Sequence, residues 1–320
     1  MAQTSEKVEQ PPGDQKLKAR QVLIGVAFGF MATFAWAGYN VAAKIGRLDG
    51  FTPADLTMLR YAGGAIFFLP FLFRGGNHVR LPLHKTFFLA CIIGPGFGMI
   101  INTAFGLAPL SHAVVIGPGV AMIVGNLLPV LLDKRVLPAA RWVGIGILFI
   151  GLLVIGLHRQ ELTGQQRDHV WLGDIGFACT GVLWSVFGYL LSKWKVSAFT
   201  GVGQVTTLSA LLFFPFYMMF FDHHETTTLN WISQIAYQGG LGGFLGLAAF
   251  ALTVDRLGPS PASLFSAFVP SSAILLAIPF MGVVPSQAEV IGVFISTIGL
   301  LAAINLSGRP QGAISGVQDK

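Results

Sequence analysis

Apolar residues in this chain gather in long runs that are separated by short polar breaks. Ten runs approach or exceed the roughly 17–25 residues that a helix needs to cross a bilayer. They cover residues 21–45, 54–73, 85–108, 113–132, 142–157, 170–192, 200–221, 231–254, 261–281 and 286–305. The alternating ten-residue segments of a β-barrel are absent. Because a backbone in lipid must satisfy its own hydrogen bonds, the pattern predicts an all-α integral membrane protein with ten transmembrane helices.

The composition excludes an ordinary soluble domain. Hydrophobic residues make up 53% of the 320 residues and charged residues only 11%, whereas a soluble domain carries roughly 25% charged residues. The formal net charge is +6, but the basic residues are scattered along the chain. We therefore expect lipid rather than nucleic acid as the partner of this surface.

The positions of Lys and Arg predict the orientation. With the N-terminus inside, 15 of the 20 basic residues fall in or beside the inner segments, and three fall in the outer loops, namely Arg47, Arg159 and Arg167. With Lys85 and Arg141 counted as juxtamembrane, only Lys44 and Arg60 remain, and both lie within predicted spans. This bias follows the positive-inside rule and predicts cytoplasmic termini. It also favours ten spans, since one helix more or fewer would invert every later loop.

The chain can be aligned with itself. Trp36 aligns with Trp184 and Phe51 with Phe199, each 148 positions later, and Gly96 aligns with Gly243, 147 positions later. An odd number of spans in each half places the halves in opposite orientations, which is the inverted-repeat plan of secondary transporters. We predict two five-helix repeats at 21–157 and 170–305, a linker at 158–169, a disordered tail at 1–20 and a second tail at 306–320.

Two tryptophan-containing segments, Phe34–Lys44 and Val182–Ser192, correspond in this repeat. In the first, Trp36, Tyr39, Asn40 and Lys44 share one helical face, and such a stripe indicates contact with something other than lipid. Aromatic and amide side chains at depth are candidates for the wall of a transport cavity, and packing between helices is the alternative for each. The candidates are Trp36, Tyr39, Asn40, Asn102, Asn126, Trp184, Gln204 and Ser266.

Three ionisable residues are candidates for gating or charge recognition. Lys44 either extends to the membrane interface or acts at the outer rim. Arg60 either bonds helix-end carbonyls or Asp55, or forms a cationic patch at the outer mouth that attracts an anionic group. His112 could titrate near neutrality or make only a hydrogen bond. No carboxylate is placed near the middle of a span, which disfavours the export of organic cations.

The chain carries no signature of an enzyme. Zinc-protease, nucleophile-elbow and phosphate-loop motifs are absent, and no cofactor or metal is expected. Asp222-His223-His224-Glu225 is interpreted as a solvated outer loop rather than as a metal site. Gly94-Pro95-Gly96 and Gly117-Pro118-Gly119 are expected to kink or break their helices.

Four segments together resemble EamA-type members of the drug/metabolite transporter superfamily. They are WAGYNVAAK from Trp36, GLAPLSHAVVIGPGVAM from Gly106, WLGDIGFACTGVLWSVFGYLLSKW from Trp171 and LGPSPASLFSAFVP from Leu257. The resemblance implies ten helices in two inverted repeats and export of small metabolites or amino acids across the bacterial inner membrane.

The resulting hypothesis is a secondary transporter that exports a small metabolite by alternating access. The expected partners are a small-molecule substrate and the lipid bilayer, and a homodimer is left open. The alternative is a membrane-embedded enzyme or a lipid-binding protein without transport activity. That alternative requires a polar cluster at one interface, which the sequence does not contain.

Overall fold

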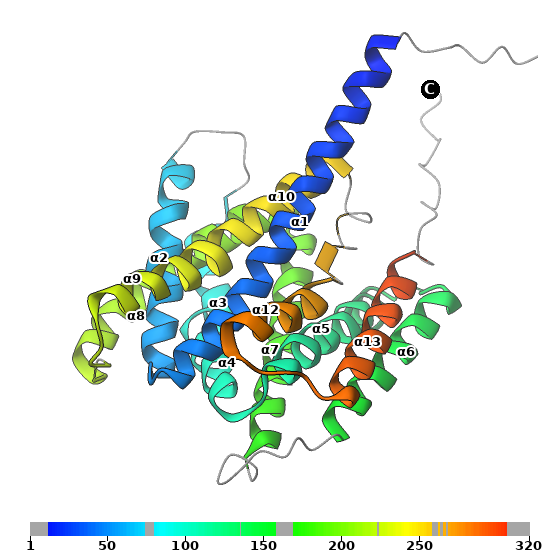
Figure 1. Cartoon of the computed structure of the whole chain (residues 1–320). Coiled ribbons are helices and arrows are strands. Elements are labelled where there is room, and N and C mark those ends of the chain that lie inside the picture. Colours follow the sequence, from blue (N-terminus) through cyan, green and yellow to red (C-terminus); the bar gives the residue numbers. More distant parts are fainter. Residues whose placement is uncertain are drawn as a thin grey trace, which may run out of the picture.

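A computed structural model describes residues 12–73, 80–134, 136–157, 169–222, 224–257, 262, 265–266 and 268–305, and all regular structure in these residues is helical. The first half contains α1 (Pro12–Leu48), α2 (Pro53–Phe73), α3 (Leu83–Ile93), α4 (Pro95–Leu107), α5 (Leu110–Asp133) and α6 (Ala139–Leu157). The second half contains α7 (Val170–Lys193), α8 (Ala198–Phe220), α9 (Thr228–Gln234), the π-helix η2 (Ile235–Leu245), α10 (Gly246–Leu257), α12 (Val269–Met281) and α13 (Gln287–Asn305). The all-α prediction is therefore confirmed, and Figure 1 shows the arrangement.

Six helical stretches in the described part are long and apolar enough to cross a membrane. They are Ala19–Leu48, Leu83–Leu107, Leu110–Asp133, Val170–Lys193, Phe199–Phe220 and Thr228–Leu257. Shorter apolar helical segments cover Arg141–Gly151, Val269–Met281 and Gln287–Gly299. The remaining helix at a predicted span is α2, whose 21 residues include Asp55 and Arg60. The chain is thus a multi-pass membrane protein.

Three local features differ from the sequence-based expectation. The first helix begins at Pro12, inside the segment expected to be a disordered tail, and proline is favoured in the first turn of a helix because it needs no N–H partner there. Gly94 separates α3 from α4 as expected. In contrast, α5 continues through Pro118 without interruption. The π-helix η2 was not predicted.

The predicted linker, apart from His169, and the C-terminal tail lie outside the described residues.

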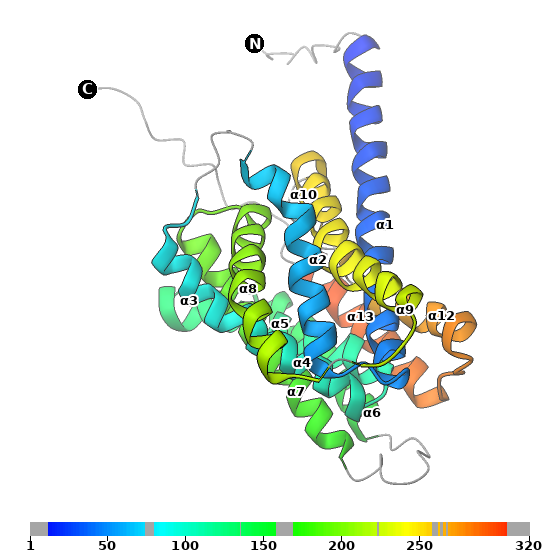
Figure 2. The same ribbon diagram turned by 90° about the vertical axis from the view of Figure 1, so that its left-hand side faces the viewer.

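Several of the main helix contacts correspond when the two halves are exchanged. The 148-residue offset relates α1 to α7, α2 to α8, α4 to α10, α5 to α12 and α6 to α13. In the structure, α1 packs on α10 and α12, and correspondingly α7 packs on α4 and α5. The pairs α2–α8 and α6–α13 each join equivalent helices, and Figure 2 shows α2 between α8 and α10. The predicted inverted repeat therefore has a direct counterpart in the packing.

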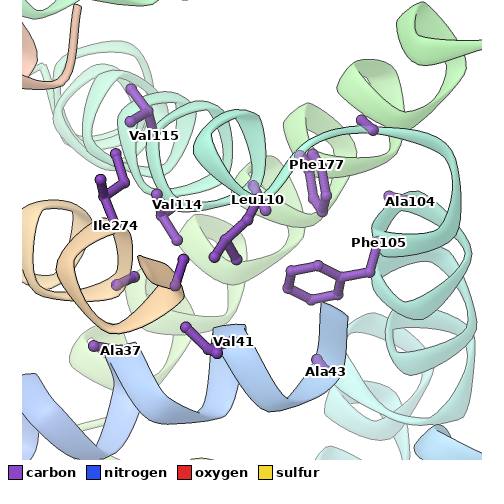
Figure 3. Close-up of a cluster of buried hydrophobic side chains, with 14 of the residues drawn as sticks. Ala37, Val41, Ala43, Ala104, Phe105, Leu110, Val114, Val115, Phe177 and Ile274 are labelled. Carbon is purple, nitrogen blue, oxygen red and sulfur yellow. The ribbon is translucent and has the colours of Figure 1, made fainter. Parts of the chain in front are cut away.

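The largest buried apolar cluster joins helices from both halves. Figure 3 shows Val41 of α1, Phe105 of α4, Val114 of α5, Phe177 of α7 and Ile274 of α12 directed toward one another. The rings of Phe105 and Phe177 meet edge to face with centroids 5.3 Å apart, a favourable geometry for aromatic pairs. This cluster packs α1 against α5 of the first half and α12 of the second half.

One close backbone approach joins α2 to η2. A Cβ atom added at Gly239 would lie 2.5 Å from the backbone Cα and C atoms of Gly63 and 2.7 Å from the backbone nitrogen of Gly64. Small residues commonly permit such contacts between membrane helices, where packing and hydrogen bonds replace the hydrophobic effect as the driving force. The crossing therefore requires glycine at position 239.

We expect the substitution Gly239→Ala to lower the free energy of unfolding by about 1–3 kcal/mol, as overpacking does, because rigid backbone cannot yield. The measurement is the midpoint of thermal unfolding in detergent. The control is Gly188→Ala in α7, where an added Cβ meets nothing within 4 Å and alanine favours the helix by up to about 1 kcal/mol. Equal midpoints for the two variants would contradict the close packing at this crossing.

Candidate functional site

A small cavity of about 70 Å³ lies between the two halves. Five of its lining residues come from α1, α2 and α3, and six come from α7, α8, η2 and α10. They are Trp36, Tyr39, Arg60, Tyr61, Ile93, Trp184, Val202, Thr206, Gly242, Gly243 and Leu247. We refer to this space as the central cavity. It contains Trp36 and Trp184, the tryptophans that correspond in the sequence repeat.

Two aromatic residues of α1 that line the cavity pack against glycines of η2 and α10. Tyr39 lies over Gly242, where an added Cβ would be 2.2 Å from the Tyr39 ring, and Trp36 lies over Gly246, with the corresponding distance 2.5 Å to the indole nitrogen. Trp36 also contacts Phe250, with ring centroids 5.4 Å apart. Glycine at these positions is what allows the rings of α1 to lie flat against η2 and α10.

Arg60 is the one Lys or Arg residue that lines the central cavity. Its guanidinium group donates a hydrogen bond to the Tyr39 hydroxyl. The guanidinium carbon lies 4.9 Å from the centroid of the Tyr39 ring and 5.7 Å from that of Phe97, within the range of cation–π attraction. The sequence suggested a bond to helix-end carbonyls, a pairing with Asp55 or a cationic patch at the outer mouth, and the position at the outer mouth stays a prediction. In the structure, Arg60 faces the cavity and is surrounded by aromatic rings.

The acid at Asp55 is engaged elsewhere. Its carboxylate accepts hydrogen bonds from the Thr52 backbone N–H (2.7 Å) and the Tyr217 hydroxyl (2.5 Å). The Asp55 backbone N–H in turn lies 3.1 Å from Thr52 Oγ1. This reciprocal pair is a capping box at the start of α2, and the spacing of Thr52 and Asp55 in the sequence could have revealed it. Asp55 therefore stabilises a helix end and leaves Arg60 without a carboxylate.

A side chain of α2, that of Tyr61, bonds the backbone at the break between α3 and α4. The Tyr61 hydroxyl lies 2.5 Å from the carbonyl oxygen of Ile93 and 2.6 Å from that of Gly94. A hydroxyl donates a single proton, so buried Tyr61 shares it between these two oxygens. The Gly94 carbonyl also accepts from the Gly98 backbone N–H at 3.1 Å. The side chain of Tyr61 thus bonds α2 to the break between α3 and α4.

The other predicted cavity residues do not line the central cavity. Asn40 and Asn126 bond carbonyls one turn earlier in their own helices, Trp36 and Met122. Asn102 is buried and donates to Thr57, Gln204 exchanges two hydrogen bonds with the backbone of Leu81, and Ser266 is half-buried. Each amide thus serves local or interhelical bonding, the alternative that the sequence left open.

Lys44 lies in a second space, of about 200 Å³, near the ends of α1 and α4. It is buried, and its ammonium group donates to the carbonyl oxygens of Phe105 and Ala108, each at 2.8 Å. These carbonyls belong to the C-terminal end of α4, where a cation is favoured by the helix dipole. Lys44 thus bonds a helix end, and its extension to the membrane interface stays a prediction, as does a role at the outer rim.

Glu289 lines the same space. It accepts hydrogen bonds from the hydroxyl of Ser111 and from the backbone N–H of Ser286, the latter at 2.8 Å. Ser286 and Glu289 form a second capping box, at the start of α13. Ser111 thereby fastens the first turn of α5 to that of α13.

His112 forms an ion pair or hydrogen bond with Asp174. The distance from Nδ1 to the carboxylate oxygen is 2.7 Å, and the side chain of His112 is 4% exposed while that of Asp174 is 24% exposed. The pair joins the first turn of α5 to α7 near its start. Asp174, which the sequence suggested was only a helix-start residue, thus also links two helices of opposite repeats.

The acidic and histidine-rich loop does not form a metal site among the described residues, where three or more His, Cys, Asp or Glu side chains never converge. His224 packs on Phe51 with ring centroids 5.0 Å apart. His223 lies outside the described residues.

The fold and the central cavity define a helical membrane protein built from two inverted repeats. The EamA-like transporter family matches residues 23–157 and 171–305, and the chain belongs to this family. No curated protein matches the chain. A solved crystal structure, described only as that of a protein, is 20% identical with a TM-score of 0.63 and covers 90% of this chain and 98% of its own. At that identity it supports the fold alone.

We expect Lys44→Met to destabilise the protein by about 1–3 kcal/mol, because it leaves buried carbonyl oxygens at the end of α4 without a donor. Thermal unfolding in detergent measures the effect. The control is Lys193→Met, since Lys193 is exposed and lies 3.4 Å from the Tyr189 hydroxyl. A Lys44 variant as stable as the Lys193 variant would mean that the two carbonyls gain nothing from the ammonium group.

Proposed function

We propose that this protein is a secondary transporter that exports a small metabolite across the bacterial inner membrane by alternating access. One observation carries the proposal: the central cavity lies between the inverted halves and receives a tryptophan from each. Substrate sites of inverted-repeat transporters lie at this interface, so that rocking of one half against the other exposes the same site to either side. Membership of a transporter family supports the same conclusion.

The proposed topology has ten spans, with both termini in the cytoplasm. The 15 basic residues in the inner segments against three in the outer loops support this orientation. The two proposed repeats cover 21–157 and 170–305.

Trp36, Tyr39 and Trp184 are the proposed contact residues for substrate. Trp184 is 38% exposed although it lies in the middle of α7, and its ring contacts Phe187 and Phe97 with centroids 5.8 and 6.4 Å apart. Aromatic rings provide a broad apolar surface with little conformational entropy to lose on binding. The side chain is therefore supported by neighbours and still accessible from the cavity.

The test is flux of labelled metabolites, including amino acids and small organic acids, in liposomes that contain the purified full chain. We expect at least one compound to cross faster than in protein-free liposomes and to exchange against its unlabelled form. Folded protein without flux for any compound of a broad panel would contradict the proposal.

The substitution Trp184→Ala should lower the transport rate at least tenfold while the yield of folded protein falls much less. The control is Trp142→Ala at the start of α6, because Trp142 is 43% exposed and does not line the central cavity. Initial rates are normalised to the amount of monodisperse protein recovered. If rate and yield fall equally, Trp184 serves helix packing and is not a substrate contact.

A further inference from the structure

The central cavity contains a fixed positive charge and lacks a negative one. Of its 11 lining residues, Arg60 is the basic residue, and Asp and Glu do not occur among them. The remaining polar side chains are those of Trp36, Tyr39, Tyr61, Trp184 and Thr206. The Tyr61 hydroxyl is already bonded to the Ile93 and Gly94 carbonyls. The cavity is thus rich in donors and poor in acceptors.

Three acids of the described helices already have partners outside the central cavity. Asp55 is held by Thr52 and Tyr217, Glu289 by Ser111 and Ser286, and Asp174 by His112. Within the described residues, Arg60 has no ion pair with an acid, and its hydrogen bond goes to the neutral hydroxyl of Tyr39. A buried charge without a counter-ion is costly.

The guanidinium group retains unused donors. Arginine has five N–H donors in a planar fork, and Tyr39 accepts from one nitrogen. The buried side-chain atoms without a hydrogen-bond partner do not include a nitrogen of Arg60. This is expected if its remaining donors face the open space of the cavity. The rings of Tyr39 and Phe97 hold the group in place through cation–π contacts. Arg60 is therefore preorganised to receive an acceptor from the cavity.

From this geometry we propose that the central cavity binds the carboxylate of a small organic acid at Arg60, with the apolar body of the ligand against Trp36 and Trp184. The inference rests on the proposed transport function and names its substrate class. A carboxylate matches the guanidinium fork with two parallel hydrogen bonds. One arginine balances a monoanion, whereas a phosphate dianion would keep excess negative charge in an apolar cavity. The cavity of about 70 Å³ has room for the head group and a short body.

The same arrangement excludes organic cations. Their positive charge would face Arg60 without an acid to offset either charge, and like charges in a medium of low dielectric constant repel strongly. Because the lining residues include no acid, we expect the cavity to select anions over cations.

The first experiment uses the wild-type full chain in lipid nanodiscs. Isobutyrate and benzoate are each compared with the matching amide and with isobutylamine or benzylamine, by thermal shift and calorimetry at constant ionic strength. We expect each carboxylate to bind at least tenfold more tightly than its amide and the amine. Equal binding of the amide or amine, or no binding of either carboxylate, overturns the inference. Tighter binding of phenyl phosphate than of benzoate would overturn the choice of a carboxylate.

The second experiment tests Arg60 itself. Arg60→Met should reduce carboxylate affinity at least tenfold, and Arg60→Lys should retain part of it because the charge remains. The control is Arg256→Met, since Arg256 also lies over a phenyl ring, that of Phe28 at 5.0 Å, but lies outside the central cavity. Unchanged benzoate affinity in folded Arg60→Met contradicts the inference. If that variant does not fold, the inference is judged from the benzoate affinity of Arg60→Lys and from the wild-type comparison of carboxylates with amides and amines.

The two proposals can fail separately. Flux of a neutral metabolite without carboxylate binding would leave the transport function intact and remove the carboxylate site. Carboxylate binding that depends on Arg60, in folded protein without flux of any anion or neutral compound, would retain the site and remove the transport function.

Discussion

The structure depends on one constraint: inside a bilayer every backbone polar group and every charge must find its partner within the protein. The ends and breaks of the helices are where this constraint acts. Lys44 supplies donors to the end of α4, and Tyr61 meets the carbonyls at the α3–α4 break. Asp55 and Glu289 cap the starts of α2 and α13. Lys44, Asp55 and Glu289 each therefore take a partner at a helix end.

Arg60 stands apart from this pattern because its surroundings are aromatic rather than acidic or carbonyl. It lies where the two repeats meet, beside rings that pack on the glycines of η2 and α10. The same close packing that brings α2 within backbone contact of η2 therefore also builds the cavity wall. Stability and recognition share these residues, which is why the proposed experiments separate ligand affinity and flux from folded yield.

The sequence predicted much of the fold and less of the site. The apolar runs indicated membrane helices, and the self-alignment indicated a repeat whose exchange symmetry appears in the helix packing. Trp36, Tyr39, Trp184 and Arg60 meet at one cavity, while the amide residues do not line it. A polar stripe on a helical face identifies the side chains that point away from the lipid. It does not show whether they line a cavity or pack against another helix. The capping boxes were not predicted, although the spacing of Thr52 and Asp55 could have revealed one of them. The π-helix had no local signal that the apolar pattern could reveal.

The sequence alone determined the properties that depend on local chemistry: the length of the apolar runs, the distribution of basic residues and the duplication of the chain. Only the tertiary structure decided which partner each polar side chain takes. Lys44 reaches a helix end 61 positions away, and Asp55 is bonded by Tyr217, 162 positions away. Such pairings depend on which helices pack together and on small shifts along their axes. For that reason the charge at Arg60 could be recognised in the sequence, but its place in a central, acid-free cavity could not.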